Sequence, residues 1–262
     1  MDIQNELLQF KMDIGIKKPE NIVNKTANCP FCDRENLTDI LDTSGSIIYL
    51  KNKFPTLEDT LQTVIIESDD CNGDISKYTP SHMKQLLSFA VQKWEDMEQT
   101  KEYKSVIFYK NHGPLSGGTL NHPHMQIVGL KNIDYKKKIT DIYFEGIKIV
   151  SKEGAELNIS THPLMGFREF NIIIDNASYL DEMAVFLQVV THYLLNNFYK
   201  GLNSYNLFFY KWNGKIICKV IPRFVVSPLF IGYSISQVSN QLEVHKDQIL
   251  ELYKDELNGY SH

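Results

Sequence analysis

The segment Asn121-His122-Pro123-His124-Met125-Gln126 decides how this chain is expected to fold and where its chemistry is expected to lie. Side chains alternate between the two faces of a β-strand, so a strand here places His122, His124 and Gln126 on one face. Met125 and Ile127 then face a hydrophobic core. A polar strand face without chemistry is the alternative for an isolated His-x-His pattern, so the flanking sequence has to decide.

A glycine-rich stretch leads into this segment. It runs Asn111-His112-Gly113-Pro114-Leu115-Ser116-Gly117-Gly118-Thr119-Leu120. Backbone N–H groups of such a loop can hold phosphate oxygens, and a neutral histidine beside the loop can act as a nucleophile. The loop and the histidine row together suit attack on a phosphorus atom.

Composition limits the class of protein and of partner. The chain has 262 residues, of which 43% are hydrophobic and 23% charged, enough for one large domain or two small ones. Its net charge of −5 gives no broad basic surface for DNA or RNA. No apolar run suits a membrane span, and the N-terminus lacks the apolar core of a signal peptide. We therefore expect a cytoplasmic protein without nucleic-acid or membrane partners.

The four cysteines include one closely spaced pair, Cys29-Pro30-Phe31-Cys32. In a cytoplasmic chain such a pair is half of a zinc site or a redox dithiol. A redox pair usually opens a helix after a strand, whereas this one follows the polar residues 21–28. Zinc is therefore favoured, and two further ligands are needed.

Hydrophobic periodicity predicts the same order of elements in both halves of the chain, after a loose N-terminal arm at residues 1–28. A helix is expected to start at Thr79-Pro80-Ser81 and to continue through Met97. The other expected helices are residues 180–199 and 238–257. Strands are expected at residues 46–50, 61–67, 104–109, 122–129, 142–150, 170–174, 205–212 and 215–221, the last two joined by an Asn213-Gly214 turn.

The second half lacks the His-Pro-His segment of the first. Where the first half has its His-Pro-His segment, the second has Ile216-Ile217-Cys218-Lys219. We therefore expect a first unit at residues 1–135 that carries the chemistry and a degenerate second unit at residues 136–262. With no low-complexity linker between them, the two are expected to form one fused structural body.

These residues resemble the galactose-1-phosphate uridylyltransferase branch of the histidine-triad (HIT) superfamily. That branch has a His-Pro-His-x-Gln motif after an Asn-x-Gly and glycine–serine segment, an N-terminal CxxC pair, and an Asn-containing segment that matches Asn52-Lys53-Phe54-Pro55. Order and spacing agree over residues 29–130. The overall likeness is greater to uncharacterised bacterial relatives of the branch than to the galactose enzyme.

The resemblance implies a fold class and an assembly. It implies an α+β fold in which tandem HIT-like units form an open, antiparallel-rich half-barrel sheet with helices packed outside. Members of the family commonly form homodimers, so a homodimer is expected by analogy.

The resemblance also implies an activity. The second histidine of the motif is the nucleophile in the family, so His124 would take a nucleoside monophosphate as a covalent nucleotidyl-histidine and pass it to a phosphate acceptor. The Pro123 carbonyl would accept from the other ring N–H of His124 and fix its tautomer. Gln126 would donate to a phosphoryl oxygen. The hydrolytic members have a third histidine there, so the glutamine favours transfer over hydrolysis. A HIT-type nucleotide hydrolase and a non-catalytic nucleotide-binding sensor remain the alternatives.

The resemblance assigns further residues to the site. Thr119 stands where the family has a serine that bonds the leaving phosphate, which makes it the third catalytic candidate. The nucleotide- and phosphate-binding candidates that it assigns are Asn52, Asn111, Gly117 and Gly118. Arg223 is a further candidate because a guanidinium group binds oxyanions with its planar fork.

A structural zinc ion is implied in the same way. The first histidine of the motif is a zinc ligand in the zinc-containing members, which points to His122. Another zinc ligand in those members follows a strand, and Cys71 lies just beyond the matching strand of this chain. Together with Cys29 and Cys32 these residues would form a closed Cys₃His site with one zinc ion per chain. His82 is the alternative to Cys71.

Specificity is expected to differ from that of the galactose enzyme. Positions that contact the sugar in that enzyme hold Ser234 and Asn240 here, and residues 1–28 contain none of its N-terminal arginines. The expected donor is therefore a nucleoside-diphosphate sugar or a dinucleoside polyphosphate, with neither galactose nor uridine assumed.

Overall fold

The computed structural model describes residues 7–22 and 28–258. Part of the predicted N-terminal arm and the last four residues lie outside this description. Internal contacts divide the chain into two compact units. The first unit contains residues 1–73 and 88–139, and the second contains residues 74–87 and 140–262.

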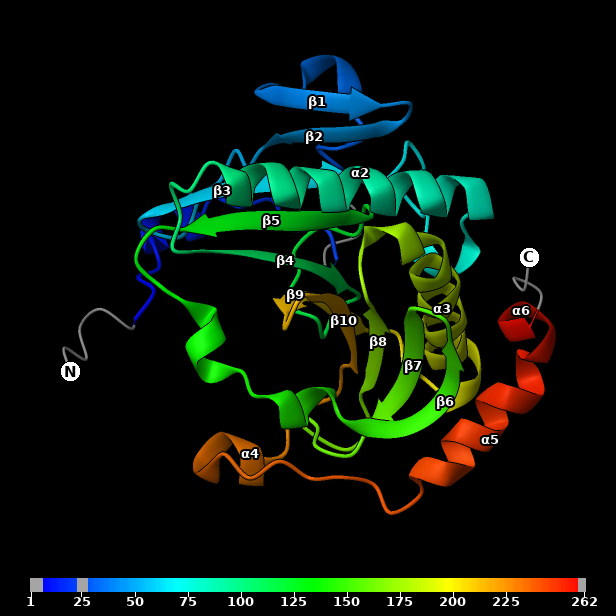
Figure 1. The fold of residues 1–262 in the computed structure, drawn as a ribbon. Helices are drawn as coiled ribbons and strands as arrows, with labels where there is room; N and C mark the ends of the chain where they lie inside the picture. Colours follow the sequence, from blue (N-terminus) through cyan, green and yellow to red (C-terminus); the bar gives the residue numbers. More distant parts are fainter. Residues whose placement is uncertain (1–6, 23–27, 259–262) are drawn as a thin grey trace. The chain divides into compact units, whose positions relative to one another are not determined.

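The first unit contains five antiparallel strands in the order β1-β2-β3-β5-β4 (Figure 1). The strands are β1 (Ile40–Ser44), β2 (Ile47–Lys51), β3 (Thr60–Ile66), β4 (Ser105–His112) and β5 (His124–Leu130). Apolar residues, many of them β-branched, fill β2, β3 and β5, and most are buried, as expected for inner strands of a sheet. The short helix α1 (Met12–Gly15) and a 3₁₀ turn at Arg34–Asn36 precede this sheet.

The long helix α2 (Pro80–Gln99) packs on one face of this sheet with its second half. The indole of Trp94 is fully buried, donates a hydrogen bond to the Val106 carbonyl at 3.1 Å and packs on the ring of Phe108. Phe108 pairs with Ile127 across β4 and β5, so both side chains lie on the helix-covered face. His124 and Gln126 alternate with this set and therefore face the opposite side of the sheet.

The second unit repeats the same order of elements. Its strands pair antiparallel in the order β6-β7-β8-β10-β9. They are β6 (Gly146–Lys152), β7 (Ala155–Ser160), β8 (Phe170–Ile174), β9 (Tyr205–Trp212) and β10 (Lys215–Pro222). Asn213 and Gly214 have positive φ angles of 50° and 79°, which produce the expected tight turn between β9 and β10.

Helix α3 (Leu180–Tyr193) packs on this second set of strands, and the fully buried ring of Tyr193 meets that of Phe170 in β8 edge to face. A π-helical turn extends α3 through Leu194–Phe198. The remaining helices are α4 (Pro228–Tyr233), α5 (Leu242–Leu252) and α6 (Lys254–Asn258), with short 3₁₀ turns at Ile75–Lys77, Tyr135–Lys138, Asp141–Phe144 and Ala177–Tyr179.

The predicted fold class is confirmed: the protein is α+β, with antiparallel strands and helices packed against them in both units. Strands β1 and β7 and helix α4 were not predicted, and residues 142–144, expected to begin a strand, lie in a 3₁₀ turn. Strand β1 is an exposed edge strand, so it lacks the apolar alternation that marks a half-buried strand.

The N-terminal segment is hydrogen-bonded where the structure describes it, which corrects the prediction of a loose arm. Phe10 forms a β-bridge with Leu57, and the Lys11 N–H donates to the Thr56 carbonyl at 2.7 Å. At the other end of the segment, the Asn21 N–H donates to the Thr119 carbonyl at 2.9 Å. Among the described residues, no helix is both long and apolar enough to cross a membrane.

Candidate functional site

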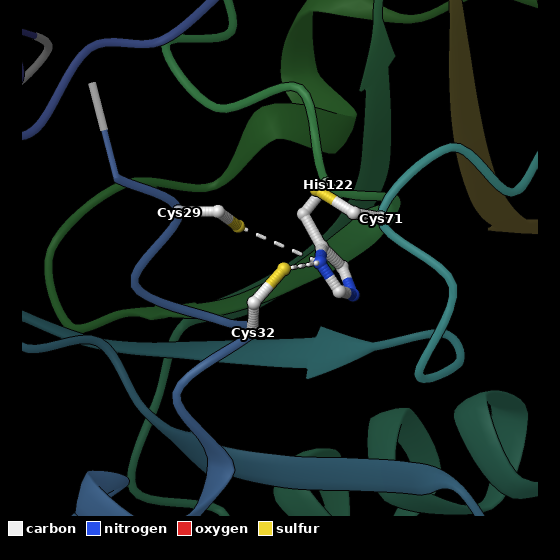
Figure 2. Close-up of side chains that lie close together, drawn as sticks. All are labelled: Cys29, Cys32, Cys71 and His122. Carbon is white, nitrogen blue, oxygen red and sulfur yellow. Dashed lines mark hydrogen bonds between the residues drawn. The ribbon is translucent and has the colours of Figure 1, made fainter. Parts of the chain in front are cut away.

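Three cysteines and one histidine of the first unit converge (Figure 2). Cys29 and Cys32 lie in the loop before the Arg34–Asn36 turn, Cys71 follows β3, and His122 lies two residues before the start of β5. Their ligand atoms all lie within 4.8 Å of one another. The structure thus brings together all four residues predicted to bind the metal.

The geometry of this cluster fits a tetrahedral metal ion. The Nδ1 atom of His122 lies 3.6 Å from the Cys29 sulfur and 3.5 Å from the Cys32 sulfur. Metal–sulfur bonds of about 2.3 Å and a metal–nitrogen bond of about 2.0 Å separate sulfur and nitrogen by roughly 3.5 Å in a tetrahedron. These distances are therefore those of ligands around a common centre.

The tautomer of His122 suits the same role. Its Nε2 lies 3.0 Å from the Ser68 carbonyl oxygen. A carbonyl only accepts hydrogen bonds, so Nε2 carries the proton and the Nδ1 lone pair faces the sulfur atoms. A backbone carbonyl that fixes a histidine ligand in this way is typical of protein metal sites. The Cys₃His group can therefore hold a metal ion.

The ring of His124 is oriented by a backbone carbonyl two residues earlier in the chain. It is 7% exposed at the start of β5, and its Nδ1 donates to the His122 carbonyl at 2.8 Å. Burial lowers the pKa of His124 to about 4, although the bond to the His122 carbonyl opposes this shift. The ring is therefore neutral, with its proton on Nδ1 and its lone pair on Nε2.

The carbonyl that holds His124 is not the one we expected. The Pro123 carbonyl was the predicted partner, but it accepts a hydrogen bond from the Glu67 N–H at 3.1 Å. Residues 122–123 precede β5 rather than belonging to it, and the Pro123 carbonyl already faces the end of β3. The His122 carbonyl then lies within reach of the His124 ring.

Gln126 is held by a residue that the sequence analysis missed. The hydroxyl of Tyr109 donates to the Gln126 Oε1 at 3.1 Å, which leaves the amide N–H groups of Gln126 for another partner. Burial raises the pKa of Tyr109 to about 12, so its hydroxyl stays a donor. Tyr109 pairs directly with Gln126 across β4 and β5, a relation that appears only once the strand register is known.

Phe31 connects the metal cluster with the histidine. It lies between the two cysteines of the CxxC pair, and its ring is 5.9 Å from the His122 ring and 5.5 Å from the His124 ring, edge to face with both. Its place inside the CxxC pair was the only signal in the sequence. A metal ion that fixes the CxxC turn would also fix the apolar wall beside His124.

A cavity of about 130 Å³ opens in front of His124. It is lined by Lys18, Pro19, Pro30, Phe31, Asn36, Leu37, Thr38, Leu50, Lys51, Asn52, Lys53, Phe54, Val64, Asn111, Gly117, Gly118, Thr119, Leu120, His124 and Gln126. All three catalytic candidates and all the ligand-binding candidates except Arg223 line it. Arg223 belongs to the second unit, where its Nη1 donates to the Asn206 side chain at 2.8 Å.

The loop around the cavity depends on its two glycines. Gly117 has a φ angle of +85°, which other residues rarely adopt. A Cβ on Gly118 would lie 3.2 Å from the Cβ of Asn111, so the absence of a side chain there allows close packing. The Asn52 Oδ1 accepts from the Phe54 N–H at 2.9 Å, which directs its amide group away from this turn.

Two other residues considered in the sequence lie elsewhere. His82, the alternative metal ligand, lies in the first turn of α2, its ring edge to face with Tyr78, and it is not part of the Cys₃His group. Cys218 is fully buried as a free thiol, and burial raises its pKa well above the ordinary value.

Two family profiles match the chain. The DUF4931 N-terminal domain matches residues 10–133 and the DUF4931 C-terminal domain matches residues 136–254, both described as domains of unknown function. The chain belongs to the DUF4931 family. A crystal structure of a DUF4931 family protein from Bacillus cereus shares 52% identity with it at a TM-score of 0.76, covering 82% of this chain and 99% of that one.

More distant solved structures share the fold of this DUF4931 chain. A uridylyltransferase structure is 14% identical, with a TM-score of 0.68, and covers 90% of this chain and 93% of that one. An ADP-glucose phosphorylase from Arabidopsis thaliana, solved with bound ADP-glucose, is 14% identical, with a TM-score of 0.65 and coverages of 89% and 90%. The predicted resemblance to the uridylyltransferase fold is thereby confirmed.

One curated protein matches part of the DUF4931 chain. A di-/tripeptide transporter from Lactobacillus helveticus is 31% identical over 104 residues, which make up 40% of this chain. The matched stretch represents only 21% of the transporter, so this chain spans about a fifth of its length.

Proposed function

We propose that this protein is a nucleotidyltransferase or phosphorylase that forms a covalent nucleotidyl-histidine at His124. The observation that carries the proposal is the hydrogen bond from Nδ1 of His124 to the His122 carbonyl at 2.8 Å. It leaves a lone pair on Nε2 of a side chain that lines a cavity, beside a glycine loop suited to phosphate. The donor would be a nucleoside-diphosphate sugar or a dinucleoside polyphosphate, and the acceptor a second phosphate compound.

The proposed reaction has two balanced steps. In the first, the Nε2 lone pair of His124 attacks the α-phosphorus, a P–N bond forms, and the P–O bond to the leaving phosphate breaks with its electron pair kept on oxygen. In the second, a phosphate oxygen of the acceptor forms a new P–O bond, and the P–N electron pair returns to Nε2. The proton stays on Nδ1 throughout, because the His122 carbonyl holds it there.

Gln126 supports transfer rather than hydrolysis in this scheme. A phosphate leaving group departs as an anion and needs no proton from the enzyme, whereas a poor leaving group would need a general acid. An amide cannot supply that proton. With its Oε1 occupied by Tyr109, Gln126 can direct its N–H groups to a nonbridging oxygen of the phosphoryl group, where negative charge accumulates.

We propose that the Cys₃His group binds one Zn²⁺ ion. Three thiolates and one imidazole in a tetrahedral arrangement suit zinc, and four protein ligands leave no open coordination position. The ion would therefore brace the loops that carry Phe31 and His122 and would not contact the substrate. Zinc identity, homodimer formation and a phosphate-binding role for Arg223 stay predictions.

The solved structures with the same fold support this choice of reaction. One is named as a uridylyltransferase and another as an ADP-glucose phosphorylase with its nucleotide sugar bound. Since a fold alone does not fix an activity, their weight is secondary to the geometry around His124.

Intact-mass spectrometry tests the proposal directly. The purified protein is incubated briefly at low phosphate with UDP-, ADP-, GDP- and CDP-sugars and with a dinucleoside polyphosphate. We expect an acid-labile adduct of one nucleoside monophosphate in the wild type and none in His124→Ala. If folded, metal-loaded wild-type protein forms no adduct yet consumes a donor by hydrolysis, the transfer mechanism is wrong.

A further inference from the structure

The cavity in front of His124 has a one-sided charge. Lys18, Lys51 and Lys53 line it, and none of its lining residues in the described part of the chain is an aspartate or a glutamate, although the chain as a whole carries a net charge of −5. Ammonium groups bind phosphate oxygens as point charges, and no carboxylate on the described part of the lining repels those oxygens. The lining therefore favours a ligand with several negative charges over one with a neutral sugar.

Lys18 is the most informative of the three lysines. Its side chain is half-buried, burial lowers its pKa, and in the described part of the chain its ammonium group has no carboxylate partner. The protein treats its fully buried lysines differently: Lys110 is ion-paired with Glu67, and Lys219 with Glu169. A half-buried ammonium group without a carboxylate, in the wall of a cavity, is what an anionic ligand requires.

The segment that carries Lys18 is anchored on both sides. On one side the Glu58 N–H donates to the Gln9 carbonyl at 3.0 Å, next to the Phe10 bridge. On the other side the Asn21 side chain accepts from the Asn121 N–H at 2.7 Å, close to the His-Pro-His segment. Lys18 is therefore placed against the cavity by backbone contacts that exist before any ligand binds.

We propose that Lys18, Lys51 and Lys53 hold the phosphate chain beyond the α-phosphate, so that the donor is a nucleotide with three or more consecutive phosphates. This inference rests on the proposed function and narrows its substrate class. A nucleoside-diphosphate sugar carries two charges on its phosphates and ends in a neutral ring. A dinucleoside tetraphosphate carries about four charges and gives each lysine a phosphate oxygen.

Equilibrium binding to His124→Ala protein tests this inference without turnover. Calorimetry would compare diadenosine and diuridine tetraphosphates with ADP-glucose and UDP-glucose, and inorganic tripolyphosphate with inorganic phosphate as base-independent probes. We expect the tetraphosphate of one base and tripolyphosphate to bind at least about tenfold tighter than the nucleotide sugars and phosphate.

Lysine variants in the same background assign the effect. Lys18→Met should weaken tetraphosphate binding by roughly tenfold and nucleotide-sugar binding by less than about twofold. Lys18→Arg should preserve most of the affinity. Lys104→Met, which removes an exposed lysine of the same unit that does not line the cavity, should change neither.

Two results would overturn the inference. One is equal binding of the tetraphosphates and the nucleotide sugars, and the other is an equal loss of both in Lys18→Met. An adduct formed from a nucleotide sugar, combined with either result, would leave His124 chemistry intact. Selective tetraphosphate binding without any adduct in the wild type would instead remove only the covalent step.

Discussion

The two units have the same strand order, but the sheet face opposite the helix differs between them. In the first unit that face carries His124 and Gln126 and borders a cavity. In the second unit, Val220 pairs with Phe170, which packs on α3, so the neighbouring Lys219 faces away from the helix. There Lys219 is fully buried and forms an ion pair with the fully buried Glu169.

The second unit fills that face with its own polar groups. The Lys219 ammonium donates to the Tyr143 carbonyl at 2.7 Å and to the Asn171 side chain at 3.0 Å, and Asn171 donates onward to Asn158 at 2.8 Å. Each group has a partner within the unit, so none is left for a ligand. The comparison teaches that a site is marked by polar groups with unused bonding capacity, such as Nε2 of His124, and not by buried polar residues as such.

Metal removal should produce the largest effect and should start in the first unit. We expect about one zinc ion per chain by elemental analysis, and its loss in Cys29→Ser because a tetrahedral site needs all four ligands. The melting temperature should fall by more than about 10 °C, since metal binding contributes directly to folding.

Cys218→Ala provides the matched control for the metal prediction. It removes the one cysteine outside the cluster and should leave the zinc content unchanged. Zinc retained at full occupancy in Cys71→Ser would show that Cys71 is not a ligand and would return His82 to consideration.

Replacing the proposed nucleophile should have the next largest effect. His124→Ala should lower the rate of nucleotide transfer at least about a thousandfold, because no other group supplies the attacking lone pair. Steady-state kinetics with the donor found by mass spectrometry measures this. Zinc content and melting temperature should stay close to those of the wild type, and a variant that keeps more than a tenth of the wild-type rate would disprove the role of His124.

The buried ion pair of the second unit should matter for stability alone. Glu169→Gln leaves the Lys219 charge without its carboxylate and should cost about 3–5 kcal/mol in the free energy of unfolding, as measured by urea denaturation. Glu169 also accepts from the N–H groups of Leu164 and Met165, which adds to the loss.

The double variant Glu169→Gln with Lys219→Met tests whether this network is only structural. It removes the unpaired charge and should recover part of the stability, while folded protein should transfer nucleotide at the wild-type rate. A folded double variant without activity would mean that the second unit takes part in the reaction, and the contrast between the two faces would fail.

The candidate site residues were easier to predict from the sequence than the contacts that support them. The structure places His124, Gln126, Asn52 and the glycine loop around one cavity. Most of these candidates could be named from the sequence because the His-Pro-His segment and the glycine loop before it are neighbours in the chain. The Cys₃His group could be predicted only because the resemblance to a known family indicated which residues, far apart in the chain, bind one metal ion together. Most strand and helix positions followed from periodicity, although the largely buried strand β7 was missed.

The contacts that could not be predicted from the sequence depend on how the strands pair and on where the N-terminal segment packs. Tyr109 reaches Gln126 only through the β4–β5 pairing, and the choice of the His122 carbonyl over that of Pro123 depends on where β5 begins. Lys18 gave no signal, because nothing in its neighbourhood reveals that residues 9–22 dock beside the glycine loop. Such contacts join positions that are far apart in the chain and have no shared periodicity.

The smallest predicted effect is that of Tyr109→Phe, compared with a tyrosine variant in the corresponding strand of the second unit. Tyr109→Phe removes the hydroxyl that holds Oε1 of Gln126, so the amide can rotate and present the wrong atom to the phosphoryl group. We expect kcat to fall by roughly fivefold to tenfold with KM nearly unchanged, because the interaction strengthens as charge develops in the transition state. Tyr210→Phe in β9, the strand that occupies the same place in the second unit, should change kcat by less than about twofold. Equal losses in the two variants would mean that the Tyr109 hydroxyl acts through stability, whereas a loss confined to Tyr109→Phe would place it in the machinery around His124.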